Sequence, residues 1–324
     1  MGIMTFPYKR VHLIWLVILS MLVFSQGCGS DTDSAVVDFS KTVAVKRPGE
    51  GMPENGILRV SVGAMISPKP TFVYYRQLLD YIGAKLGLEA QLVQRKTYEE
   101  TNQLFAKGQI DLAFLCSGPY TTGKEKYGFE ALAVPQIRGK PFYQSYLIVN
   151  KDSRFHTLED LRGRAFAFTD PDSNTGRLVP IYWLLQMGER PESFFKNINY
   201  TYGHDNSILA VAKALVDGAA VDSLIWEYYN QRDPIHASKT RIIKRSEFFG
   251  SPPVVVSAAL PVQQKEHIRK LLFTMHQDPK GKKILNELMI EQFVAPKDEW
   301  YDSIFRMKQD LHLLETKPHA TEKP

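Results

Sequence analysis

Short apolar segments alternate with longer amphipathic segments through most of the chain, and this alternation limits the possible folds more than any other feature. Residues 57–62 read as a strand, residues 73–86 as a helix closed by Gly87, and residues 110–116 as a buried strand. Strands that alternate with helices usually build parallel sheets, because each helix carries the chain back across the sheet. The pattern therefore predicts an α/β fold.

The length and composition suit a globular protein with two lobes. The chain has 324 residues, of which 44% are hydrophobic and 23% charged. We expect residues 56–144 and 251–314 to form lobe 1, residues 145–250 to form lobe 2, and residues 315–324 to be a polar tail. The net charge of +5 is small for this length, and lysines and arginines are scattered, so a nucleic-acid partner is not indicated.

The N-terminus has the pattern of an export signal. Lys9 and Arg10 precede an apolar run at residues 11–24, which is short for a membrane span. Small residues and Cys28 follow this run, as at a bacterial lipoprotein cleavage site, although Ser25 stands where leucine is usual. An uncleaved signal anchor is the alternative.

This pattern predicts a signal peptide at residues 1–27 and a lipid-anchored, extracytoplasmic protein. Residues 28–55 are polar, with Gly, Pro, Asp and Lys and no periodic apolar face, and read as a flexible tether. If Cys28 carries the lipid, Cys116 is the one cysteine left and no intrachain disulfide can form.

The loop Asp170–Pro180 joins an alternating aromatic strand to an apolar helix. Its centre reads Ser173, Asn174, Thr175 and Gly176, all residue types that favour helix N-caps. A helix start leaves backbone N–H groups unpaired and carries partial positive charge, so such a loop can hold a tetrahedral oxyanion. An ordinary capped turn has the same composition.

Two other strand ends carry similar polar groups. Residues 117–122 follow the buried strand at 110–116, and residues 203–207 follow a strand near 198–202. Ligands of open α/β sheets bind beyond the carboxyl ends of the strands, so these segments are candidates for the same site.

Several short motifs in this order resemble the phosphate/phosphite/phosphonate-binding proteins of ABC uptake systems. They are Asp111 to Leu115 with Gly118 to Tyr120, Tyr143 to Ser153, Asp170 to Pro180, and Gly203 to Asp205 with Val221 to Ser223. The resemblance covers roughly residues 57–290. It implies a two-lobed periplasmic-binding fold, type II-like, with parallel or mixed sheets, flanking helices and a hinge that closes on a ligand in the cleft.

The resemblance also implies which residues bind the ligand. The loop would grip the oxyanion, His204 would contact the same oxygens, and Tyr98 and Tyr143 would line the other lobe. Here Ser-Asn-Thr-Gly replaces the usual Ser-Thr-Ser-Gly, and Arg177 stands where an uncharged residue is common. The full expected ligand set is Ser173, Asn174, Thr175, Gly176, His204, Tyr98, Tyr120, Tyr143, Asp222 and Asp205.

Each of these roles has a structural alternative. Asp205 could instead cap a helix, His204 could be a core histidine, and Tyr98 and Tyr143 could only pack between lobes. The carboxylate of Asp222 could pair with a ligand ammonium group or accept a proton from a monoprotonated oxyanion.

The expected function is that of a monomeric solute-binding protein that delivers a small phosphorus oxyanion to an ABC permease. A ligand sensor that signals to a membrane receptor is the alternative. An enzyme is less favoured, because the sequence has no His-Glu-x-x-His, Gly-x-Ser-x-Gly or P-loop motif. We expect no cofactor or metal, since the hydroxyl-rich loop suits an anion. The sequence does not indicate which oxyanion is bound.

Overall fold

The computed structural model describes residues 56–63 and 65–315. The expected signal peptide, Cys28, the tether and nearly all of the polar tail lie outside these residues. No helix in the described part of the chain is both long and apolar enough to cross a membrane.

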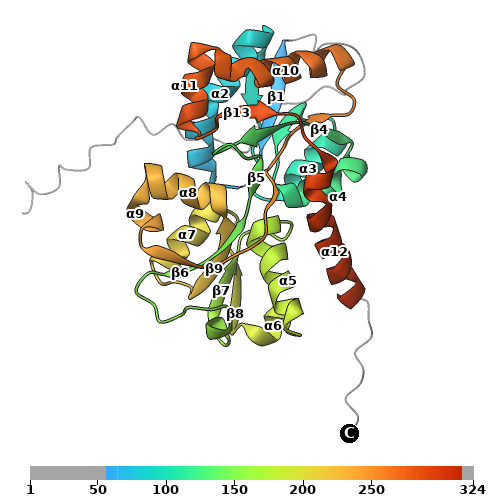
Figure 1. Ribbon diagram of the computed structural model, residues 1–324. Coiled ribbons are helices and arrows are strands. Elements are labelled where there is room, and N and C mark those ends of the chain that lie inside the picture. The colour runs from blue at the N-terminus through green and yellow to red at the C-terminus, as the bar shows by residue number, and fades with distance from the viewer. Residues whose placement is uncertain (1–55, 64, 316–324) are drawn as a thin grey trace, which may run out of the picture. The chain divides into compact units, whose positions relative to one another are not determined.

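The first sheet has six strands in the order β13-β4-β12-β3-β1-β2 (Figure 1). Strand β1 pairs in parallel with β2 and β3, while β12 and β13 run antiparallel to their neighbours. The strands are β1 (Ile57–Val62), β2 (Glu89–Leu92), β3 (Leu112–Phe114), β4 (Phe129–Gln136), β12 (Val254–Ser257) and β13 (Gln292–Val294).

Five helices accompany this sheet. They are α2 (Pro68–Leu86), α3 (Tyr98–Ala106), α4 (Ser117–Tyr127), α10 (Val262–Thr274) and α11 (Pro279–Glu287). One core packs α2, α10 and α11 against the sheet. The sequence predicts a helix over residues 98–106, and α3 spans these residues, with a complete capping box of Thr97 and Glu100 at its start. Gly87 closes α2 with φ 69°, a left-handed conformation that favours glycine.

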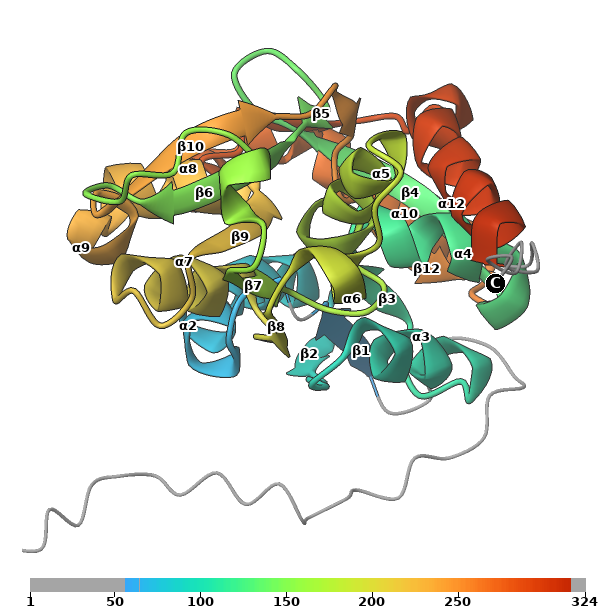
Figure 2. The same ribbon diagram turned by 90° about the horizontal axis from the view of Figure 1, so that it is seen from below.

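The second sheet has five strands in the order β10-β6-β9-β7-β8. Strands β9, β7 and β8 are parallel, and β6 pairs antiparallel with β9 and β10. Helices α5 and α6 lie on one face and α7, α8 and α9 on the other (Figures 1 and 2). The strands are β6 (Ser145–Asn150), β7 (Ala165–Phe168), β8 (Asn197–Tyr200), β9 (Gly218–Asp222) and β10 (Thr240–Arg245). The helices are α5 (Val179–Gln186), α6 (Pro191–Phe194), α7 (His204–Ala212), α8 (Ser223–Arg232) and α9 (Pro234–Ala237).

A short ribbon and the last helix connect the two sheets. Strands β5 (Phe142–Tyr143) and β11 (Phe249–Gly250) pair antiparallel where the chain crosses from one sheet to the other. Helix α12 (Asp302–Glu315) contacts α4 of the first lobe and α5 of the second. The expected two-lobed α/β architecture is therefore present, and the residue boundaries of the lobes stay a prediction.

Two local predictions were wrong. The sequence predicts a helix over residues 280–291, but this helix ends at Glu287, and the chain turns through Met289, with φ 59°, into strand β13. Strand β13 has only three residues, too few for a periodic pattern. The sequence also predicts a helix that Thr157 caps, but the structure has a single 3-10 turn there, Glu159–Leu161, in which Asp160 accepts N–H bonds from His156 and Thr157.

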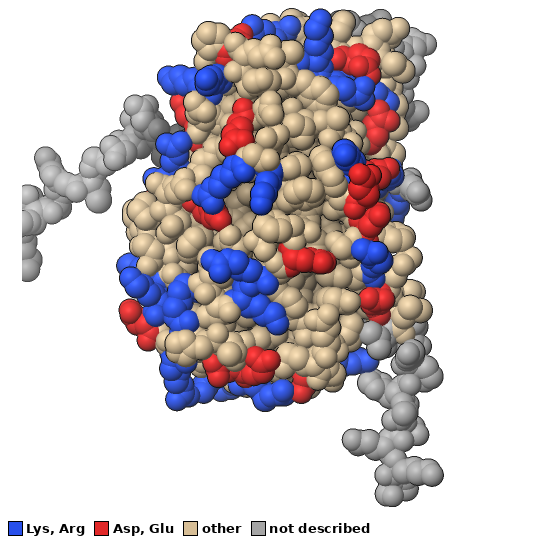
Figure 3. All heavy atoms as spheres, in the orientation of Figure 1, with Lys and Arg blue, Asp and Glu red and all other residues tan. Residues whose placement is uncertain are grey.

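Charged side chains of both signs are interspersed over the face shown in Figure 3. Lysines and arginines gather over the lower left of that face, with acidic side chains at their margin. This distribution agrees with the small net charge of the sequence.

Candidate functional site

Four helical segments begin close to one another where strands of the two sheets end. Helix α4 follows β3, the π-turn Asn174–Leu178 leads from β7 into α5, and α7 and α8 follow β8 and β9. The starts of α4 and the π-turn are so close that a Cβ on Gly118 would lie 2.2 Å from the carbonyl oxygen of Asp172. Helix starts present unpaired N–H groups and partial positive charge, so this junction favours an anion.

The loop after β7 has the capped geometry that its composition predicts. The hydroxyl of Ser173 accepts the backbone N–H of Gly176 over 3.0 Å, and the loop continues as a π-turn rather than as an α-helix. A Cβ on Gly176 would lie 2.4 Å from the hydroxyl of Thr169, so only glycine fits there. The side chains of Asn174 and Thr175 are fully buried at the start of this turn.

His204 is fully buried at the start of α7 and is held in one tautomer. The backbone N–H of Asp222 donates to Nδ1 of the ring over 3.1 Å, and the Thr169 hydroxyl lies 3.2 Å from the same nitrogen. A backbone N–H can only donate, so Nδ1 is unprotonated and the hydrogen is on Nε2. Burial lowers the pKa of His204 to about 3, so the ring is a neutral donor.

Four buried polar atoms at this junction have no hydrogen-bond partner among the described residues. They are the Tyr98 hydroxyl, the Asn174 Oδ1, the Thr175 hydroxyl and the His204 Nε2, and all four side chains have 0% exposure. Tyr98 comes from the first lobe and the other three from the second. An unpaired buried polar group costs about 1–3 kcal/mol, so a set of four indicates a place for a polar ligand.

Tyr143 and Asn174 support each other within the site. The Asn174 amide donates to the Tyr143 hydroxyl over 3.1 Å. Both tyrosines of the site are fully buried, and burial raises the pKa of Tyr98 and of Tyr143 well above the usual value. Both hydroxyls therefore keep their protons at neutral pH and can act as donors.

Two buried carboxyl groups lie beside these donors. Asp222 caps α8 by accepting the N–H groups of Leu224 and Ile225, and burial raises its pKa to about 7. Asp170 accepts the N–H of Tyr98 from the other lobe over 3.2 Å, and burial raises its pKa to about 6. Among the described residues, no lysine or arginine forms a hydrogen bond or ion pair with Asp170, Asp222 or the four unpartnered atoms, so the donors of this site are neutral. The amino group of Lys308 donates instead to the Gly118 carbonyl over 2.6 Å.

The lobes meet directly at the edge of the site. The N–H of His204 donates to the carbonyl of Met65 over 2.8 Å. The N–H of Ser67 donates to Asp205 over 2.9 Å, and the Ser67 hydroxyl donates to the same carboxylate. Asp205 thus joins the lobes, and the structure does not bring its carboxylate to the unpartnered donors.

Other sequence candidates also lie elsewhere. The Tyr120 hydroxyl is 3.3 Å from Asp298, and its ring packs against Phe129 and Tyr301 in the core. Arg177 donates to the Tyr200 hydroxyl and to the Pro171 carbonyl, away from the buried donors. The structure brings together Ser173, Asn174, Thr175, Gly176, His204, Tyr98, Tyr143 and Asp222.

Sequence reasoning missed two residues that shape the site. Thr169 fills the space beside Gly176 and contacts the His204 ring, and Cys116 is fully buried at the start of α4. The position of Thr169 at the end of a predicted strand, directly before the loop, is the sequence feature that could have identified it as a site residue. In the described part of the chain, no three His, Cys, Asp or Glu side chains are grouped so that they could hold a metal ion.

Known proteins with a similar sequence point to one family. Residues 62–301 match the family described as "ABC transporter, phosphonate, periplasmic substrate-binding protein". The phosphonates-binding periplasmic protein of Escherichia coli is 30% identical over 164 residues, which are 49% of this chain and 48% of that protein. The probable ABC transporter phosphite binding protein PhnD1 of Prochlorococcus marinus is 26% identical over 107 residues, 31% of this chain and 36% of that protein. The matches thus span about half or less of these relatives.

Solved structures show the same fold. A binding protein component of an ABC phosphonate transporter from Pseudomonas aeruginosa has a TM-score of 0.78 at 23% identity, over 83% of this chain and 91% of that one. PhnD1 of Prochlorococcus marinus in complex with methylphosphonate has a TM-score of 0.71 at 16% identity, over 80% of this chain and 99% of that one. With the family match over residues 62–301, these findings show that the chain belongs to the phosphonate-type periplasmic substrate-binding proteins of ABC transporters.

Proposed function

We propose that this protein captures a small phosphorus oxyanion, such as a phosphonate, phosphite or phosphate, between its lobes. The observation that carries the proposal is the set of four buried, unpartnered polar atoms contributed by Tyr98, Asn174, Thr175 and His204. A tetrahedral oxyanion supplies acceptors to the Tyr98 hydroxyl on one lobe and to the Thr175 hydroxyl and the His204 Nε2–H on the other. The names of relatives that bind phosphonates, phosphite and methylphosphonate support this ligand class.

Neutral donors would hold the anion between the lobes. The His204 Nε2–H, the hydroxyls of Thr175 and Tyr98, and the helix starts supply hydrogen bonds and partial positive charge without a formal cation. Asp222 would share one proton with the oxyanion, because its raised pKa of about 7 lets the carboxyl be protonated near neutral pH. When Asp222 and the oxyanion are both deprotonated, their negative charges would repel each other.

Transport from the cell exterior is the proposed role. The family serves ABC transporters, so we infer delivery to a permease by a lipid-anchored, monomeric protein with no enzymatic activity. A receptor-signalling role on the same fold is the alternative. Deletion of an adjacent permease should abolish ligand uptake in cells if the transport role is correct.

Cys28 carries the anchoring part of the proposal. In cells, Cys28→Ser should accumulate as an unprocessed or mislocalised precursor, while the unchanged protein should lose residues 1–27 and fractionate with membranes. Unchanged protein that keeps residues 1–27 and is wholly soluble contradicts lipid anchoring, and this result would leave the ligand proposal unaffected.

A thermal-shift screen tests the ligand class. Phosphate, phosphite, methylphosphonate and aminoethylphosphonate are added to the protein separately, with sulfate as a non-phosphorus control. A ligand at 100 times its dissociation constant stabilises the folded state by about 2.7 kcal/mol, so at least one phosphorus compound should raise the melting temperature in a concentration-dependent way. The proposal is contradicted if none of the four phosphorus compounds, at millimolar concentration, changes the melting curve of the protein without ligand.

A further inference from the structure

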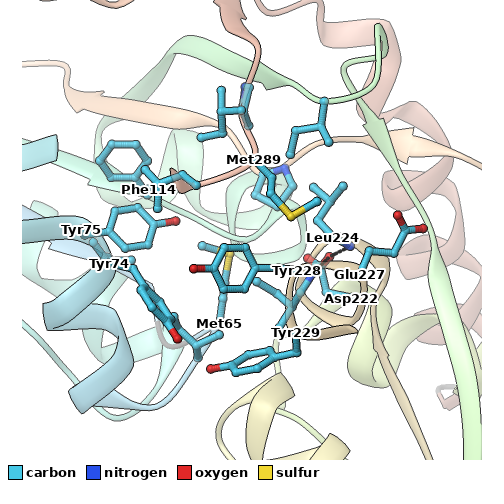
Figure 4. Close-up of a pocket in the computed structure, with 18 of the residues that line it drawn as sticks. Met65, Tyr74, Tyr75, Phe114, Asp222, Leu224, Glu227, Tyr228, Tyr229 and Met289 are labelled. Atoms are coloured by element: carbon cyan, nitrogen blue, oxygen red, sulfur yellow. Dashed lines mark hydrogen bonds between the residues drawn. The ribbon is translucent and has the colours of Figure 1, made fainter. Parts of the chain in front are cut away.

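A cavity of about 100 Å³ lies between α2 of the first lobe and α8 of the second (Figure 4). Its wall is mostly apolar and aromatic, with contributions from Tyr75, Phe114, Leu224, Tyr228, Tyr229 and Met289. We call this space the side chamber. None of the four residues with unpartnered atoms lines it, so it is a separate compartment of the cleft.

Asp222 belongs both to the side chamber and to the oxyanion site, by which we mean the region around the four unpartnered atoms. Asp222 lines the chamber, while its backbone N–H donates to His204 in the oxyanion site. Burial raises the pKa of Tyr75 above its usual range, with a further contribution from the nearby Asp222 carboxylate. A group attached to an oxyanion beside His204 would therefore extend past Asp222 into the side chamber.

The chamber has no free carboxylate to pair with a cationic group. Glu227 also lines it, but this carboxylate already accepts the Tyr146 hydroxyl over 2.6 Å and forms an ion pair with Arg138. Asp222 is at the oxyanion end, and two of its bonds go to the start of α8. Among the described residues, no other carboxylate lines the chamber.

We propose that the side chamber selects organophosphonates that carry a short, uncharged hydrocarbon substituent. This inference rests on the proposed function and adds a substrate class to it. A cavity of 150 Å³ holds benzene and one water occupies about 30 Å³ of liquid, so about 100 Å³ suits roughly three carbon atoms. A charged ammonium group in the same place would lose its hydration without gaining a free carboxylate.

A matched pair of ligands tests the selection. Aminoethylphosphonate and propylphosphonate have the same number of heavy atoms and differ at the terminal position, which is an ammonium or a methyl group. Calorimetric titration of the full chain should show propylphosphonate binding roughly fifteenfold more tightly than methylphosphonate, at about fourfold per buried methylene. It should also bind at least about tenfold more tightly than aminoethylphosphonate.

The outcomes separate this inference from the proposed function. If methylphosphonate binds but propylphosphonate binds no better, or if aminoethylphosphonate binds as tightly as propylphosphonate, the side-chamber inference is wrong and the oxyanion site stands. If no phosphorus compound binds, the proposed function fails and the inference fails with it.

Met289 provides a test of location. Its φ of 59° suits aspartate and asparagine, so Met289→Asp and Met289→Asn shorten the side chain equally and differ only in charge. The ratio of aminoethylphosphonate to propylphosphonate affinity should be at least about tenfold higher in the aspartate variant. Equal ratios in two folded variants would place the substituent outside the chamber. The ligand pair on the unchanged protein decides the selection even if a variant fails to fold.

Discussion

The backbone N–H of Asp222 donates to Nδ1 of His204 over 3.1 Å, and this bond determines what the histidine can offer a ligand. With Nδ1 as an acceptor, the neutral ring carries its hydrogen on Nε2. Nε2 is buried and has no partner among the described residues. The same bond ties the start of α7 to the end of β9, so the donor is fixed before a ligand arrives.

His204→Ala should weaken oxyanion binding by roughly ten- to a hundredfold. A hydrogen bond to a charged group contributes about 1.5–3 kcal/mol, and the Nε2–H donor is lost. Calorimetry with the best phosphorus ligand measures the effect. His267→Ala, at an exposed position of α10, is the control and should bind like the unchanged protein. Equal affinity of both variants would remove His204 from the site.

The neutral state of His204 also predicts how stability depends on pH. Its pKa is lowered from 6.5 to about 3 in the folded state, so the unfolded chain takes up a proton first as the pH falls. Stability should therefore fall below pH 6.5, by up to about 1.4 kcal/mol per pH unit. As the pH is lowered from 7 to 4.5, the free energy of unfolding of His204→Gln should rise relative to that of the unchanged protein, as denaturant titrations can measure. If the difference between the two free energies is the same at all pH values, the pKa of His204 is not lowered in the folded protein.

Asp222→Asn should change the pH dependence of both stability and binding. The pKa of Asp222 is raised from 3.8 to about 7, so its contribution to stability is present at low pH and is lost as the pH rises through 7. Asparagine keeps the cap of α8 and has no such loss. As the pH is raised from 4 to 8, the free energy of unfolding of the variant should therefore rise relative to that of the unchanged protein.

The same variant tests the shared proton. In the unchanged protein, binding above pH 7 requires uptake of the proton between Asp222 and the oxyanion, so affinity should fall by up to about tenfold per pH unit. In Asp222→Asn this decrease should be absent. Parallel pH profiles in the two proteins would show that Asp222 does not face the ligand.

Thr175→Val should weaken binding and stabilise the free protein. The Thr175 hydroxyl is fully buried without a partner among the described residues, so valine removes an unsatisfied group while keeping the shape. Tyr98→Phe should act in the same direction. Tyr120→Phe is the matched control, because its hydroxyl lies beside Asp298 and away from the site. The expectation is contradicted if Thr175→Val and Tyr98→Phe bind like Tyr120→Phe.

Much of the fold could be predicted because its signals are local. The capping box of Thr97 and Glu100 sets the start of α3, and the hydroxyl of Ser173 caps the loop that the sequence marks. Strand β13 could not be predicted, because it is stabilised by pairing with β4, far away in the sequence. Local periodicity contains no information about such a partner.

The site was predicted only where one loop or strand end carries it. Which way Asp205 points depends on Ser67 in the other lobe, and Tyr120 is buried because Tyr301 packs against its ring. Both contacts join residues distant in sequence. Likewise, Tyr75 and Tyr228 meet at the side chamber only after α2 and α8 have docked.

Ser67→Ala should weaken binding of all ligands by the same factor. The N–H and hydroxyl of Ser67 both donate to Asp205, so this contact holds the lobes together without touching the buried donors. A mutation that disfavours the closed state reduces affinity in proportion to the population of that state. Losing one hydrogen bond to a charged group corresponds to a loss of ligand affinity of at most roughly ten- to a hundredfold.

The ratio of propylphosphonate to aminoethylphosphonate affinity should stay unchanged in Ser67→Ala, because the side chamber is intact. Ser193→Ala is the control, since the Ser193 hydroxyl donates to the backbone carbonyl of Arg190 within the second lobe. If Ser67→Ala alters the ratio between ligands, Ser67 acts on the ligand itself and not on closure.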